Sequence, residues 1–183
     1  MKKLIKVSII FILCFAIITL TPAIVYAVRN NHKYIDVDMA VRQEYINRLQ
    51  GEYEFQEYTY TREQMRKALE DELDFRHYIY REGKTPRNEQ GFSVALIRYI
   101  KVDISKCDIE YYCITLCHEM CHLKFFTRNE IYTQFMTFKT LYESNNAELR
   151  QVGIRFGVYV LNGSYDHEYD CSYLITDYLS KVD

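Results

Sequence analysis

Two histidines lie four residues apart, and a glutamate follows the first of them, in the segment His118-Glu119-Met120-Cys121-His122. In a helix, residues four apart share one face, so both imidazoles can reach a single ion at about 2.0–2.1 Å per nitrogen. Glu119 would lie about 100° around the helix axis from His118, where its carboxylate can take a proton from a water on that ion. The pattern predicts a Zn²⁺ site with Glu119 as general base, a chemistry suited to amide hydrolysis.

A catalytic zinc site usually has three protein ligands and one position for water, so the sequence must supply a third ligand. Glu130 is the best candidate, because it begins the helix expected after the chain reverses and so faces the helix end that carries His122. Thr127 and Glu130 also have the spacing of a capping box, in which the glutamate bonds back to the chain instead. Both roles stay open for Glu130. The other candidate ligands are Glu143, Asp166 and His167, of which His167 could instead stabilise an oxyanion.

The cysteines offer a second set of metal-binding side chains. Cys113, Cys117 and Cys121 recur every four residues and form a ridge on one helix face, where a buried apolar role is the simplest interpretation. Two of them point away from the histidines, so one helix cannot surround an ion with four ligands. There are two alternatives to a catalytic zinc site. One is a closed structural zinc site that also uses cysteines, and the other is a helix whose two histidines bind no metal. Cys107 and Cys171 could form a disulfide, although the sequence does not establish pairing.

The segment Thr115-Leu116-Cys117-His118-Glu119-Met120-Cys121-His122-Leu123 resembles the active-site helix of the zincin metallopeptidases. Asn129-Glu130-Ile131-Tyr132-Thr133 resembles the second segment of the branch with a glutamate ligand, the gluzincins. The resemblance covers about residues 92 to 143. It implies a peptidase with zinc bound by His118, His122 and Glu130 and with Glu119 as the base. Lys124 departs from the family pattern, which usually has an apolar residue there.

Apolar periodicity indicates the elements that would position these residues. Alternation from Phe92 to Ile104 predicts a strand. Ser105 and Asp108 mark the start of the helix that carries both histidines, and Thr127 marks the start of the next, so the two helices form an antiparallel hairpin. We also expect helices from Asp38 to Gly51, from Thr61 toward Gly83, from Ala147 to Leu161 and from His167 to Leu179, a small strand or hairpin at 53–60, and a loop at 83–91.

The first 27 residues differ from the rest of the chain. Three lysines precede an uncharged stretch of 22 residues from Val7 to Val28, and about 20 apolar residues suffice to cross a bilayer as a helix. Val25-Tyr26-Ala27 also offers the small residues of a signal-peptidase site. We therefore expect residues 1–27 to be a signal peptide or a transmembrane anchor, and residues 28–183 to lie outside the cytoplasm.

Composition limits the remaining choices. With 49% hydrophobic and 26% charged residues, residues 28–183 are expected to form one globular domain, α+β and mostly helical, with a small sheet. That segment carries 20 basic and 25 acidic residues, a net charge of −5, and has no basic patch for nucleic acid. The sequence thus predicts a zinc-dependent metallopeptidase for peptide or protein substrates, attached to the membrane only if its leader is retained. The alternative is a non-catalytic, zinc-stabilised interaction module at the cell surface.

Overall fold

The structure, a computed structural model, describes residues 31–54, 57–86, 89–165 and 169–182. The expected leader at 1–27 lies outside these residues, and no helix within them is long and apolar enough to cross a membrane. The mostly helical α+β fold with a small sheet is confirmed. Its elements are the helices α2 (Met39–Glu52), α3 (Arg62–Glu72), α4 (Ile109–Phe125), α5 (Glu130–Tyr142), α6 (Ala147–Leu161) and α7 (Ser172–Leu179) and the strands β1 (Ile79–Glu82), β2 (Gly91–Val94) and β3 (Tyr99–Val102).

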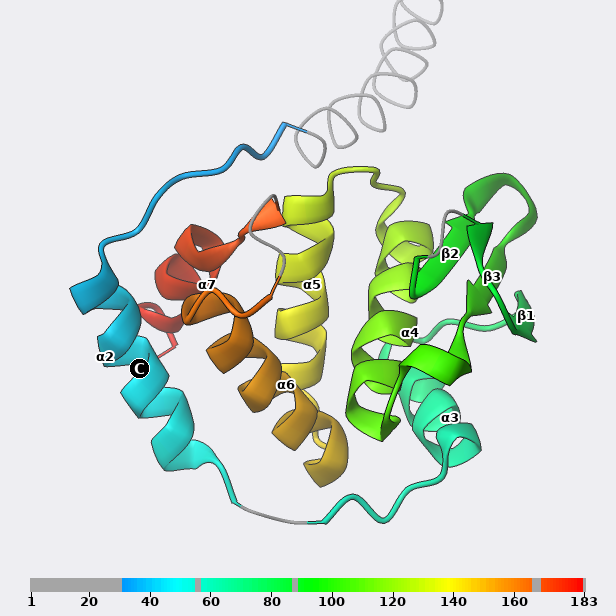
Figure 1. Ribbon diagram of the computed structural model, residues 1–183, viewed down its shortest axis with the longest axis horizontal. Helices are drawn as coiled ribbons and strands as arrows, with labels where there is room; N and C mark the ends of the chain where they lie inside the picture. The colour runs from blue at the N-terminus through cyan, green and yellow to red at the C-terminus, as the bar shows by residue number, and fades with distance from the viewer. Residues whose placement is uncertain (1–30, 55–56, 87–88, 166–168, 183) are drawn as a thin grey trace, which may run out of the picture.

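Helix α4 lies at the centre of the fold. Figure 1 shows it between the sheet and α5, with α6, α7 and α2 beyond α5. Because it is covered by α3, α5, α6, β2 and β3, most of its 17 residues are buried. The predicted cysteine ridge, Cys113, Cys117 and Cys121, is fully buried here. The cysteines of the described residues are all free, so the disulfide considered between Cys107 and Cys171 does not form.

The sheet has the order β1-β3-β2, with β1 parallel and β2 antiparallel to β3. The single strand predicted from Phe92 to Ile104 is wrong. The chain reverses through a short 3-10 turn at Ala95–Ile97 and a left-handed Arg98 with φ of 48°. Apolar alternation continues through both strands because both pack on α4, and the reversal contains none of the glycine, proline or asparagine residues that usually mark a turn.

The chain after α3 also differs from the prediction. The capping box at Thr61 is present, but α3 ends at Glu72 and does not continue toward Gly83. Asp74 and His77 adopt left-handed backbone conformations, which cannot continue a right-handed helix. Strand β1 therefore occupies residues for which the sequence predicts a helix.

The remaining helices follow the sequence more closely. α2 begins after Asp38, whose side chain caps it, and α6 has the predicted bounds. α7 begins at Ser172, and the start expected at His167 lies outside the described residues. Residues 53–54 and 57–60, the described part of the expected strand or hairpin, form no strand. There Tyr58 donates a hydrogen bond of 2.8 Å to the buried carboxylate of Glu110.

Helices α5 and α6 approach each other closely at Gly153. A Cβ atom at this buried position of α6 would lie 2.5 Å from the backbone nitrogen of Tyr142 and 2.6 Å from the carbonyl carbon of Leu141. Backbone atoms cannot swing aside as the end of a long side chain can. The absence of a side chain at position 153 therefore sets the distance between the two helices.

We expect Gly153→Ala to lower the free energy of unfolding by about 1–3 kcal/mol, because the added methyl group forces α5 and α6 apart. Urea denaturation followed by circular dichroism measures this change. Gly51→Ala in α2 is the matched control: its Cβ would meet no atom within 4 Å, so it should be neutral or stabilising by up to about 1 kcal/mol. Equal losses in the two variants would contradict the close approach.

Candidate metal centre

His118 and His122 of α4 and Glu130 of α5 bring three ligand atoms together. Nε2 of His118 lies 3.0 Å from both Nε2 of His122 and Oε2 of Glu130, and the latter two atoms are 3.3 Å apart. Of the His, Cys, Asp and Glu side chains that the structure describes, this is the only group of three close enough to hold a metal ion. The three residues predicted as ligands are thus brought together.

The spacing within this triad fits a tetrahedral zinc ion. Bonds of about 2.0–2.1 Å place two tetrahedral ligands about 3.3–3.4 Å apart. The three observed distances equal this value or fall slightly below it, so small side-chain rotations would admit an ion. Two imidazoles and one carboxylate are also a ligand set that suits catalytic zinc.

A short reversal between α4 and α5 places the third side chain. Phe126 takes the left-handed conformation, with φ of 49°, and its backbone N–H donates to the carbonyl of His122. The backbone N–H of Thr127 donates to the same carbonyl at 3.2 Å. The chain therefore turns back within one helical turn of the second histidine, as the predicted antiparallel hairpin requires.

The first turn of α5 directs Glu130 toward the histidines. Asn129 caps this helix, and its side-chain oxygen accepts from the backbone nitrogen of Tyr132 at 2.8 Å. The capping box considered for Thr127 and Glu130 is therefore wrong. Because Asn129 satisfies the helix end, the carboxylate of Glu130 is left to contact both imidazoles.

The reversal also orients the ring of His122. Its Nδ1 lies 2.9 Å from the carbonyl oxygen of Thr127 and 3.2 Å from the hydroxyl of Thr133. A carbonyl oxygen can only accept, so Nδ1 carries a proton and Nε2 is the nitrogen left for a metal.

The charges of the triad stabilise one another. Burial disfavours the charged form of His122, but the hydrogen bond and charge of Glu130 outweigh it and raise the pKa of His122 to about 9. Burial likewise disfavours the Glu130 carboxylate, yet the two histidines hold its pKa well below the usual range. Glu130 is therefore ionised throughout the neutral range, as a metal ligand must be.

Glu119, the predicted base, lies on the adjacent face of α4 and is 8% exposed. Strand β2 packs directly against it. A Cβ atom at Gly91 would lie 2.6 Å from Oε1 of Glu119 and 2.7 Å from Cγ2 of Thr115. Only glycine permits this approach of strand to helix, so Gly91 helps to set the position of the carboxylate. The sequence analysis treats Gly91 only as the end of a loop.

A cleft of about 1260 Å³ opens over these side chains. The three triad residues and Glu119 all line it, so candidate ligands and base face one space. Residues 89–96, which include β2, line one part of the cleft, and α4 and α5 line another. The segment before α7 contributes Ser164, Tyr165 and Tyr169.

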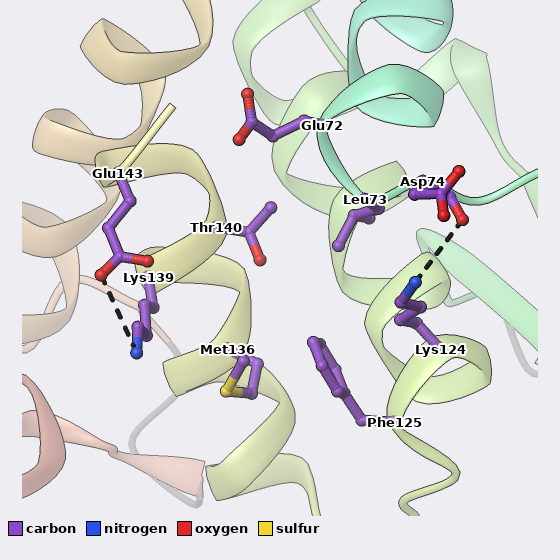
Figure 2. A pocket seen from close by; sticks show the side chains of 9 residues that line it. All are labelled: Glu72, Leu73, Asp74, Lys124, Phe125, Met136, Lys139, Thr140 and Glu143. Carbon is purple, nitrogen blue, oxygen red and sulfur yellow. Dashed lines mark hydrogen bonds and ion pairs between the residues drawn. The ribbon is translucent and has the colours of Figure 1, made fainter. Parts of the chain in front are cut away.

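None of the alternative third ligands is placed in the triad by the described structure. Glu143 lies at the opposite end of α5, where it accepts a hydrogen bond of 2.7 Å from Tyr178 and pairs with Lys139 at 3.8 Å. Figure 2 shows it at a separate cavity of about 440 Å³, which is also lined by the ends of α3 and α4. Glu143 is therefore not part of the triad. Asp166 and His167 lie outside the described residues.

Gln134 is a polar residue of the cleft that the sequence analysis misses. It lies four residues after Glu130, on the same face of α5, and is 3% exposed. Among buried side-chain polar atoms of the described residues, only its Oε1 and the Nδ1 of His118 have no hydrogen-bond partner. A histidine that binds a metal through Nε2 carries a proton on Nδ1 and usually donates it to an oxygen. These two atoms are a complementary donor and acceptor on adjacent helices.

Comparisons with protein-family models, with curated proteins and with solved structures find no match to this chain.

We expect Gln134→Leu to weaken zinc binding about 10- to 100-fold, because it removes the unpaired buried oxygen that can accept the Nδ1 proton of His118 when Nε2 binds the metal. Competition with a chromophoric chelator measures the dissociation constant. Thr137→Val is the matched control, since it removes a different buried polar group of α5, the hydroxyl that donates to the carbonyl of Thr133 at 2.9 Å. Equal zinc affinity in the wild type and Gln134→Leu would show that Gln134 does not orient the histidine.

Proposed function

We propose that the chain is a zinc-dependent metallopeptidase that hydrolyses peptide bonds outside the cytoplasm. The observation that carries this proposal is the convergence of His118, His122 and Glu130, within 3.3 Å of one another, in a cleft that Glu119 also lines. Two neutral imidazoles and a carboxylate bind zinc and leave a coordination position open.

The zinc ligands and Glu119 have different roles in the proposed reaction. Zinc, when bound, lowers the pKa of a coordinated water to about 7 and polarises a carbonyl group. The carboxylate of Glu119 takes the proton of the attacking water and delivers it to the departing amine. Glu119 lines the cleft and packs against β2, but it is not one of the three side chains that lie close enough to share one ion.

The shape of the cleft favours an extended peptide as substrate. Strand β2 is an edge strand of the described sheet, and its whole length lines the cleft. An exposed strand edge offers backbone N–H and C=O groups that can pair with an extended chain. Phe92, Val94 and Leu96 line the same cleft and add apolar contacts for substrate side chains.

The proposed location rests on the leader. The basic start and uncharged stretch of residues 1–28 support export, either with cleavage near Ala27 or with the leader kept as an anchor. The substrate would then be a peptide or protein on the outer side of the membrane. Nucleic acid is not proposed as a partner, because residues 28–183 carry net negative charge.

We expect Glu119→Gln to keep zinc bound and to lower peptide cleavage at least about 100-fold, because the amide cannot accept the proton. Metal analysis of the purified protein and cleavage of a peptide library measure the two properties. Glu130→Ala should instead lose zinc. If His118→Ala loses zinc but the wild type cleaves no peptide, the chain is a zinc-stabilised interaction module and not a peptidase.

We expect Gly91→Ala to lower kcat roughly 10- to 100-fold, because the new methyl group must displace the Glu119 carboxylate or strand β2. Zinc affinity should stay at the wild-type value, since the atoms nearest to the new methyl group belong to Glu119 and Thr115 and not to the three ligands. Ser93→Ala in the same strand is the control, because it adds no atom to the cleft wall. Unchanged kcat in Gly91→Ala would mean that the strand does not set the position of the base.

A further inference from the structure

Residues 31–38, here called the strap, begin four residues after Ala27, the end of the expected leader, and contain no helix or strand. Figure 1 shows them running past the start of α5 to α2. His32 and Val37 are partly buried, whereas the other strap residues are exposed. These two residues are the main points at which the strap is attached to the domain, and the exposed Asp36 adds an ion pair with Arg42 at 3.4 Å.

His32 is attached to the first turn of α5. The Nδ2 amide of Asn129 donates to the carbonyl oxygen of His32 at 2.8 Å. The imidazole stacks on Tyr132, with ring centres 5.0 Å apart and planes inclined by only 9°. Its Nδ1 also lies 3.1 Å from the hydroxyl of Tyr173 in α7.

The two residues of α5 that hold His32 also determine where Glu130 points. Asn129 uses one side of its amide to cap α5 and the other to hold the strap. Tyr132 donates the backbone N–H that the cap accepts, and Glu130 lies between them. Tyr132 further contacts Phe125 of α4 edge-on, at 6.5 Å between ring centres, and Figure 2 shows Phe125 at the end of that helix. Contacts of the strap thus reach both helices that supply ligands.

The other end of the strap is also fixed. Nε of the buried Arg42 donates to the carbonyl of Val37 at 2.9 Å. The same guanidinium pairs with Asp170 at 2.9 Å and donates to Ser172 at 2.9 Å, which ties it to the start of α7. The strap therefore cannot leave the first turn of α5 without breaking the hydrogen bond from Asn129 and the aromatic stack of His32 on Tyr132.

We propose that the strap is a positioning element of the metal centre, and that His32 holds Glu130 in place through Asn129 and Tyr132. Zinc affinity then depends on the segment that joins the leader to the domain. Cleavage near Ala27 would leave the strap in place and zinc affinity unchanged. Cleavage or displacement of the chain after His32 would instead weaken zinc binding. The inference rests on the metal centre of the proposed function and not on peptidase activity.

The test uses the full-length chain in detergent and compares the zinc affinities of its variants by chelator competition. The visible absorption of Co²⁺ bound in place of zinc reports the geometry of the site. His32→Ala removes the stack and should weaken zinc binding roughly three- to ten-fold and change the Co²⁺ spectrum. His32→Phe keeps the stack on Tyr132 and should stay within about two-fold of the wild type. Asn129→Ser keeps a helix cap but removes the amide that holds His32, so it should resemble His32→Ala.

Two controls separate positioning from general stability. Tyr34→Ala alters an exposed aromatic residue of the strap whose hydroxyl bonds only to Asp36, and it should bind zinc normally. Ile46→Val weakens the core through α2, away from α5, and should lower stability without changing zinc affinity. If His32→Ala and Asn129→Ser both bind zinc with wild-type affinity, the strap does not position the metal centre. That result would leave the metal centre itself standing. Absence of zinc from the wild type would overturn the metal centre and the strap with it.

Discussion

The hydrogen bond from Nδ1 of His122 to the carbonyl of Thr127 joins the end of α4 to the reversal that begins α5. It fixes the tautomer of the ring, and it holds the turn that carries Glu130 close to the helix that carries the histidines. Three donor atoms can meet at one point only if two helices keep their relative position to within a few tenths of an ångström. A short reversal has few conformations, so it meets this demand better than a long loop.

Two glycines hold this helix pair from opposite sides. Gly91 lets β2 lie directly on α4, and Gly153 lets the backbone of α5 lie directly on α6. The pair therefore lies between a sheet and a helix. The close contact is with backbone atoms at Gly153 and with the side chains of Glu119 and Thr115 at Gly91. Such rigid support matters because the triad joins a carboxylate and two imidazoles that would otherwise relax toward solvent.

The sequence predicted the three candidate ligands better than the structure that surrounds them. The spacing of His118 and His122 determines their common helix face, and a short reversal necessarily brings an early residue of the next helix near them. The identity of the cap was not predictable in the same way, because Thr127 and Asn129 are both good capping residues and only the path of the turn decides between them. The contributions of Gly91 and Gln134 depend on contacts between distant segments, which single-sequence periodicity does not contain.

The errors in the sheet have a similar origin. Arg98 adopts a left-handed conformation that its side chain does not favour, so the reversal between β2 and β3 leaves no local signature. Asp74 and His77 end α3 in the same way. Tertiary contacts impose these conformations, for example the stacking of the Arg98 guanidinium on Phe75 at 4.4 Å.

The reactivity of the buried cysteines, those of the ridge on α4 and Cys171, depends on whether the helices of the domain are packed. Burial raises the pKa of Cys113, Cys117 and Cys171 well above the usual range, so these thiols stay protonated and do not react as nucleophiles while the core is closed. An alkylating or oxidising reagent can reach them only through an opening of the packed helices. Folded molecules would keep the thiols of the described residues reduced, and molecules that open would be the ones that become modified.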